Sequence, residues 1–99
     1  MARDWNTDKN GRGFDPEVVG AIWRKGETFL PHDLNEWRFD KCGYLIRFSH
    51  YGNTKSVHGW EIDHIKPVAK GGSDEPENLQ PLQWKINRDK ADKYPWSCP

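Results

Sequence analysis

The sequence predicts a small α+β fold in a single domain. A chain of 99 residues has room for one domain with a modest hydrophobic core. Apolar residues recur at helical spacing near both ends, and two short runs rich in β-branched and aromatic residues lie between them. Six tryptophans add large apolar surfaces, which offset a content of 30% charged residues and argue against disorder.

The first third of the chain is expected to hold an arm, a helix and a loop. Residues 1–13 are rich in Asp, Asn, Arg and Gly without periodicity, so we expect a flexible arm. Within residues 14–36, Asp15-Pro16 is typical of a helix start and Lys25-Gly26 of a helix end. The apolar positions between them follow the helical period and mark one packing face: Val18, Val19, Ile22 and Trp23.

The middle of the chain predicts two strands. Residues 37–43 fit either a short helix or a turn. Residues 44–48 and 60–65 have strand composition, and turn residues or Pro67 follow them. These two runs could pair as an antiparallel hairpin.

A glycine loop and a helix complete the pattern. Residues 69–77 contain Gly71-Gly72 and can form little except a loop. Residues 79–81 could form a short return segment, and a helix is expected from residue 81 or 82 to residue 91. Asn87 should lie beside the buried stripe of this helix, where its side chain can reach the preceding strand. The stripe consists of three apolar residues at helical spacing: Leu79, Leu82 and Ile86.

Charge gives little information in total, because fifteen basic and fifteen acidic residues cancel. A protein that binds nucleic acid through its phosphates is usually strongly basic, so any such contact is expected to be local. The best candidates lie on the last predicted helix: Lys85, Arg88 and Lys90. A solvated helix face is the alternative interpretation. Trp60 and Trp84 could stack on bases, although core positions are the simpler interpretation.

The cysteines and the hydropathy bear on the cellular setting. Cys42 and Cys98 belong to no CxxC pair, which argues against a structural zinc site built from thiolates. Buried or inert thiols are the default interpretation, and a disulfide is the alternative. No apolar run approaches the roughly 20 residues that a bilayer span requires, and the first residues lack the apolar segment of a secretion signal. We therefore expect a cytoplasmic protein without membrane contact.

Asp63-His64, followed by Asn78 and Asn87, combines a carboxylate, an imidazole and two carboxamides within 25 residues. This combination suits metal-assisted hydrolysis of a phosphodiester. Asp63 and Asn87 offer oxygen ligands to one divalent ion, and His64 could be the general base that takes a proton from the attacking water. Such a base must be neutral. Since the ordinary pKa of histidine is about 6.5, we expect activity to fall below roughly pH 6.

Strand geometry sets a condition on this site. Adjacent side chains on a regular strand point to opposite faces, so Asp63 and His64 can address one phosphate only where the strand ends, bends or bulges. Asn78 could brace the long loop against the backbone near His64, or it could cap the following turn. The remaining histidines lie in predicted loops and are expected to be structural or solvated: His32, His50 and His58. His32 beside Asp33 could instead form a catalytic pair.

Four segments together resemble the HNH endonucleases, whose catalytic core is the ββα-metal fold. They are EIDHIKP at 61–67, KGGSD at 70–74, NLQPL at 78–82 and NRDK at 87–90. The resemblance implies an HNH nuclease core within residues 37–99, preceded by an N-terminal helix and a β-hairpin. It also implies metal ligation by Asp63 and Asn87, a catalytic base at His64 and an orienting role for Asn78.

Two departures from the family pattern concern metals. Many members carry zinc-knuckle cysteines where this chain has Gln83 and Ile86, so no structural zinc is expected. The third motif residue is often histidine and is here Asn87, whose harder oxygen favours Mg²⁺ or Mn²⁺. Glu61 should share a strand face with Asp63. There it could support the metal ligands, add a ligand or be a surface carboxylate.

The sequence therefore predicts a divalent-metal-dependent endonuclease that hydrolyses DNA phosphodiester bonds, with RNA open as a further substrate. One alternative is a non-catalytic nucleic-acid-binding or interaction module that retains the HNH fold. Another is a nuclease that depends on a protein partner for targeting.

Overall fold

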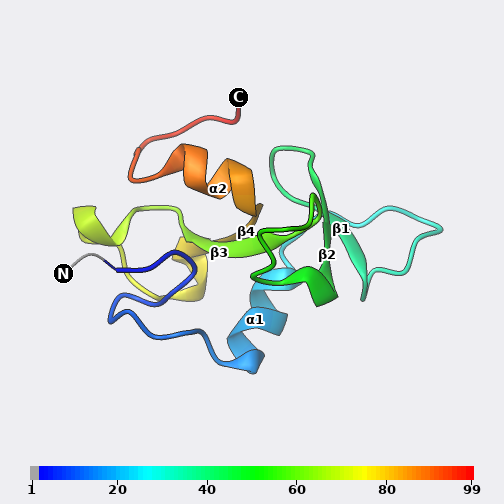
Figure 1. Ribbon diagram of the computed structural model, residues 1–99, viewed down its shortest axis with the longest axis horizontal. Helices are drawn as coiled ribbons and strands as arrows, with labels where there is room; N and C mark the ends of the chain where they lie inside the picture. Colours follow the sequence, from blue (N-terminus) through cyan, green and yellow to red (C-terminus); the bar gives the residue numbers. More distant parts are fainter. Residues whose placement is uncertain (1–2) are drawn as a thin grey trace.

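A two-stranded antiparallel sheet lies at the centre of the computed structural model, which describes residues 3–99 (Figure 1). Its strands are β3 (Trp60–His64) and β4 (Leu79–Gln83), in a register that runs from Trp60 opposite Gln83 to His64 opposite Leu79. Helix α2 (Trp84–Lys90) follows β4 directly and lies on one side of the sheet, and α1 (Pro16–Trp23) lies on the other. The expected order of strand, strand and helix is therefore present, and the fold is α+β.

A second two-stranded sheet forms beside the first from β1 (Trp37–Phe39) and β2 (Leu45–Arg47). The predicted pairing of residues 44–48 with residues 60–65 is thus wrong, because β2 pairs with β1 and β3 pairs with β4. The cause is local: the Asp40 carboxylate accepts hydrogen bonds from the backbone N–H groups of Cys42 and Tyr44 and closes a tight turn between β1 and β2.

The final helix is shorter than predicted, because residues 81–83 belong to β4. The Gln83 side chain accepts hydrogen bonds from the N–H groups of Lys85 and Ile86 and so caps the helix at that point. Pro81 is tolerated in the strand opposite Ile62, whose N–H is directed away from the ladder, toward Asn6. Residues opposite each other on antiparallel strands share this orientation, so Pro81 removes no ladder hydrogen bond.

The hydrophobic core lies between α1 and the sheet. Asp15 and Pro16 begin the helix as predicted, and Val19, Ile22 and Trp23 are buried. They pack against Ile46, Trp60, Ile62 and Leu79. Trp60 is 0% exposed, so it is a core residue and not a surface for base stacking. Among the described residues, no helix has the length and apolar character needed to cross a membrane.

The N-terminal arm, here residues 3–13, is anchored to the domain, in contrast to the predicted flexible arm. The Asn6 side-chain oxygen accepts hydrogen bonds from the Ile62 backbone N–H at 2.8 Å and from the Tyr51 hydroxyl at 2.9 Å. Further along, the Lys9 backbone N–H donates to the Asp74 carboxylate. The arm thereby covers the free edge of β3, where an unpaired N–H needs an acceptor. Residues 1 and 2, also assigned to the predicted arm, lie outside the described part.

Cys42 and Cys98 form a disulfide, so the default prediction of unpaired thiols is wrong. The bond ties the turn between β1 and β2 to the segment after α2. Sequence separation gave no indication of this contact, because 56 positions separate the two cysteines whereas their Cα atoms lie 5.4 Å apart.

Candidate active site

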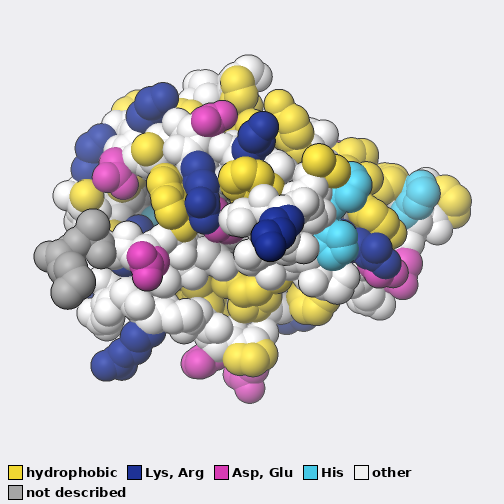
Figure 2. Space-filling model, in the orientation of Figure 1, with side chains coloured by type: hydrophobic (Ala, Val, Ile, Leu, Met, Phe, Trp, Pro, Cys, Tyr) yellow, Lys and Arg dark blue, Asp and Glu magenta, His cyan; other side chains and the backbone are white. Residues whose placement is uncertain are grey.

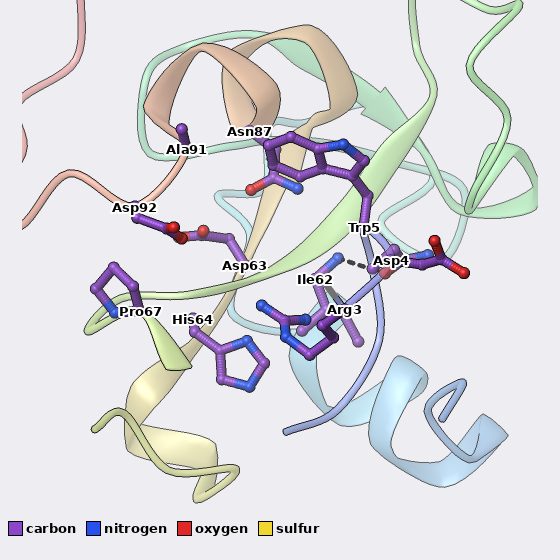
Figure 3. A pocket seen from close by; sticks show the side chains of 11 residues that line it. Arg3, Asp4, Trp5, Ile62, Asp63, His64, Pro67, Asn87, Ala91 and Asp92 are labelled. Atoms are coloured by element: carbon purple, nitrogen blue, oxygen red, sulfur yellow. Dashed lines mark hydrogen bonds between the residues drawn. The ribbon is translucent and has the colours of Figure 1, made fainter. Parts of the chain in front are cut away.

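A cavity of about 340 Å³ opens where β3 ends (Figure 3). Its lining brings together Asp63 and His64 from β3, Asn87 from α2 and residues 3–6 of the N-terminal arm. Because β3 ends at His64, the two adjacent side chains can both reach the cavity although they leave the strand on opposite faces. The sequence required the strand to end, bend or bulge at this point, and the strand ends there.

Asp63 is held at the cavity wall by two polar neighbours. Its carboxylate accepts a hydrogen bond from the Gln80 side chain at 2.8 Å, and the Lys90 ammonium lies 3.3 Å from its other oxygen. Burial raises the pKa of Asp63, and the Gln80 hydrogen bond and the Lys90 charge oppose the shift without cancelling it. A divalent cation beside this carboxylate would favour its ionised form.

Asn87 is oriented by Glu61. The Asn87 amide nitrogen donates to the Glu61 carboxylate at 2.9 Å, and Arg88 donates to the same carboxylate at 3.0 Å. This leaves the Asn87 amide oxygen directed toward the side of the cavity where Asp63 lies (Figure 3). Glu61 is only 2% exposed, so it is not a surface carboxylate. It supports a candidate metal ligand.

His64 is paired with Asp74. The ring Nε2 lies 2.7 Å from the Asp74 carboxylate, so Nε2 carries the donated proton, and in the neutral ring Nδ1 holds the lone pair. Nδ1 lies on the side of the ring toward Arg3 (Figure 3). His64 is 4% exposed, yet it lines the cavity and is not enclosed by apolar packing.

Asn78 ties the glycine loop to the backbone that follows His64. Its side-chain oxygen accepts from the Lys66 N–H at 2.8 Å, and its nitrogen donates to the carbonyls of Lys66 and Ser73 at 3.1 and 2.8 Å. These are the contacts expected of a brace. They hold the segment that carries Asp74, one residue after Ser73, at a fixed position relative to His64.

The predicted phosphate contacts on the last helix are revised. Lys90 is 1% exposed, and its ammonium donates to the His64 carbonyl oxygen at 3.0 Å, so the prediction that it contacts nucleic acid is wrong. A lysine this deeply buried needs such partners. Arg88 pairs with Glu61 and stacks between Trp5 and Trp84, while Lys85 is exposed. On the face shown in Figure 2, basic and acidic side chains are interspersed without a single basic field.

Four residues of the site were not identified from the sequence: Arg3, Asp74, Gln80 and Lys90 in its buried role. Asp74 was the easiest of these to predict from the sequence, since it belongs to the loop motif and a carboxylate near a candidate base can orient that base. Gln80 lies opposite Asp63 in the register, so correct pairing of the strands would have found it. Arg3 belongs to no sequence motif that would have indicated a place in the site.

The other histidines lie outside the cavity lining. The His50 ring is hydrogen-bonded to Ser56, and the His58 ring to the Leu45 carbonyl oxygen. His32 is exposed and lies against the Phe29 ring. The catalytic pairing of His32 with Asp33 therefore has no support. Within residues 3–99, no three or more His, Cys, Asp or Glu side chains form a cluster suited to a metal ion. A carboxylate and an amide oxygen are the donor set for a hard ion that keeps most of its water ligands.

Strands β3 and β4, helix α2 and the residues at their shared cavity define the class, which is the ββα-metal fold. The family model described as HNH endonuclease matches residues 41–93, more than half of the chain. The chain therefore belongs to the HNH endonuclease family. A search of curated proteins and a search of solved structures each found no match.

Proposed function

We propose that this chain is a divalent-metal-dependent endonuclease that hydrolyses DNA phosphodiester bonds. The observation that carries the proposal is the meeting, at one cavity, of a general-base candidate with a free ring nitrogen and of two oxygen donors. Family membership supports a nuclease-type function. RNA as a substrate and a protein partner for targeting remain extensions of this proposal.

The proposed roles follow from the contacts of each side chain. His64 takes a proton from water at Nδ1, and the Asp74 carboxylate holds the Nε2 proton and stabilises the imidazolium that forms. The resulting hydroxide forms a bond to phosphorus. The bond from phosphorus to the leaving oxygen breaks, and that oxygen is protonated by solvent.

Asp63 and Asn87 would hold the ion, with Mg²⁺ or Mn²⁺ as the best match to their oxygen donors. When bound, the ion supplies positive charge to the phosphate oxygens and the departing oxygen. Glu61 keeps the Asn87 oxygen directed at the cavity, and Gln80 keeps the Asp63 carboxylate in place. The structural zinc of some family members has no cysteine ligands here, since both cysteines are in the disulfide.

The proposal is tested by plasmid nicking. Purified protein is incubated with supercoiled plasmid and Mg²⁺ or Mn²⁺, with and without chelator. We expect nicking that the chelator stops, a loss of about 10²-fold or more in His64→Ala and a loss of roughly 10- to 100-fold in Asp74→Asn. His32→Ala is the matched control and should stay near wild type, because this histidine is exposed and absent from the cavity lining.

Metal binding, followed by calorimetry, separates the alternatives. His64→Ala should still bind the ion, whereas Asp63→Ala should not. A wild-type chain that binds neither ion and cuts no plasmid would support the non-catalytic module. Metal binding without cleavage would instead indicate a nuclease that needs a partner.

A further inference from the structure

One wall of the cavity comes from outside the family match. The matched segment begins at residue 41, whereas residues 3–6 of the N-terminal arm line the cavity together with Asp63, His64 and Asn87. The site as folded is therefore larger than the ββα core. The function of this added wall is a separate question from the role of the core.

The arm is fixed at three points around the end of β3. Asn6 accepts hydrogen bonds from Ile62 and Tyr51, and it does so at a φ of 58°, which asparagine tolerates better than most residues. The Trp5 ring lies 5.3 Å from the Arg88 guanidinium. Lys9 donates its backbone N–H to the carboxylate that orients His64. These contacts keep Arg3 next to the reacting groups.

The Arg3 side chain lines the cavity and is oriented by Thr7. Its Nη1 donates to the Thr7 carbonyl oxygen at 2.7 Å and to the Thr7 hydroxyl at 3.1 Å, which orients the guanidinium. Its other nitrogens donate no hydrogen bond to the described residues, and none of the ion pairs found among those residues involves it. Figure 3 shows the side chain on the same side of the cavity as the His64 ring.

Among the described residues, one charged side chain of the cavity lining can attract a phosphate. The charged side chains lining the cavity are Asp4, Asp63, Asp92 and Arg3, and of the described lining residues only Arg3 has a permanent positive charge. A phosphodiester that enters would be repelled by these carboxylates, and a cationic side chain beside them would offset part of that repulsion. A guanidinium can donate two parallel hydrogen bonds to phosphate oxygens.

We propose that the N-terminal arm is the substrate-binding wall of this site and that Arg3 contacts a backbone phosphate of the nucleic acid in the cavity. This inference rests on the proposed nuclease function. It adds a residue from outside the matched core. It also explains how a chain without net charge can hold a polyanion locally.

Three substitutions at residue 3 separate phosphate binding from a purely structural role. Arg3→Lys keeps the positive charge, Arg3→Gln keeps a hydrogen-bond donor for Thr7 without charge, and Arg3→Ala keeps neither. Arg12→Ala is the matched control, because it removes the same charge from the same arm at a residue outside the cavity lining. We expect nicking to fall roughly 10- to 100-fold in Arg3→Ala and Arg3→Gln, with partial recovery in Arg3→Lys and near wild-type rates in Arg12→Ala.

A second readout does not depend on catalysis. Binding of a fluorescein-labelled DNA duplex is measured by anisotropy in chelator at several salt concentrations. Loss of one phosphate contact should lower the slope of log affinity against log salt by about 0.9 in Arg3→Ala and Arg3→Gln, and not in Arg12→Ala.

The two readouts keep this inference distinct from the proposed function. If wild type neither binds the metal ion nor nicks, the nuclease proposal fails, and the salt slopes still decide whether Arg3 binds phosphate. Equal effects of Arg3→Ala and Arg12→Ala on the slope would overturn the inference. So would an Arg3→Gln variant that matches wild type in both assays, because only the Thr7 contact would then matter.

Discussion

At the scale of single residues, Tyr51, which donates a hydrogen bond to Asn6 of the arm, makes the stability of the fold depend on pH. Burial raises the pKa of Tyr51 to about 12, against the opposing hydrogen bond to Asn6. Below pH 10 the phenol is protonated in both the folded and the unfolded chain. As the pH rises above 10 only the unfolded chain ionises, so stability is lost through this window at about 1.4 kcal/mol per pH unit.

The destabilisation caused by Tyr51→Phe should therefore shrink as the pH becomes alkaline. At pH 7 we expect the variant to be about 1 kcal/mol less stable, because the Asn6 hydrogen bond is lost. The difference in stability should close near pH 11, because ionisation of Tyr51 in the unfolded chain lowers the stability of wild type there. Urea unfolding from pH 7 to 11 measures this, with Tyr44→Phe, at a tyrosine 44% exposed, as the control for losing one phenol. A difference that stays constant with pH would contradict the prediction.

Residue types revealed the part of the site that lies close together in sequence. Asp63, His64, Asn78 and Asn87 could be singled out because their chemistry and order form one pattern, and the structure puts Asp63, His64 and Asn87 on one cavity with Asn78 behind the loop. Their catalytic and metal roles stay predictions. Arg3 could not be found, because its place depends on Asn6 reaching a strand 56 residues away.

At the scale of elements, Gly72 in the loop between β3 and β4 is packed too closely against the backbone to accept a side chain. A Cβ at Gly72 would lie 1.7 Å from the Lys66 carbonyl oxygen, so the backbone would have to move. We expect Gly72→Ala to lower the free energy of unfolding by about 2 kcal/mol and to reduce nicking, because Asp74 follows two residues later. Gly13→Ala, where nothing lies within 4 Å of the added Cβ, should be close to neutral. Equal stability of the two variants in urea would refute this.

Helix boundaries and strand partners differed in how well the sequence predicted them. Pro16 and the apolar spacing of α1 act locally, and that helix lies where predicted. Strand pairing depends on contacts between distant residues, and here the turn at Asp40 joins β1 to β2. The strand β4 then includes Leu82, which was expected in a helix, as well as Leu79 from the expected return segment, and both are buried as expected. Burial was therefore easier to predict than the structure that produces it.

At the scale of the whole molecule, the disulfide closes a loop of the chain that contains the entire ββα core. With 56 positions between the cysteines, the chain-entropy model gives a stabilisation of about 4 kcal/mol at 25 °C. We expect reductant to lower the urea midpoint of wild type substantially. The double variant Cys42→Ser with Cys98→Ser should have the same lowered midpoint with and without reductant. Two reactive thiols in the folded, unreduced protein would argue against the bond.

The disulfide also bears on the predicted cytoplasmic location. Such bonds usually persist in oxidising compartments. The location stays a prediction, and mass measurement of the chain under non-reducing conditions is the direct check of the cysteine state.

The Ile62 amide hydrogen is a natural reporter of the cavity wall, because it donates to an arm side chain and not to the neighbouring strand. Detachment of the arm would expose that hydrogen to exchange with solvent while the ladder of β3 and β4 stayed closed. Local opening at this one amide would thus record how often the candidate site loses its covering segment, at a free-energy cost below that of global unfolding.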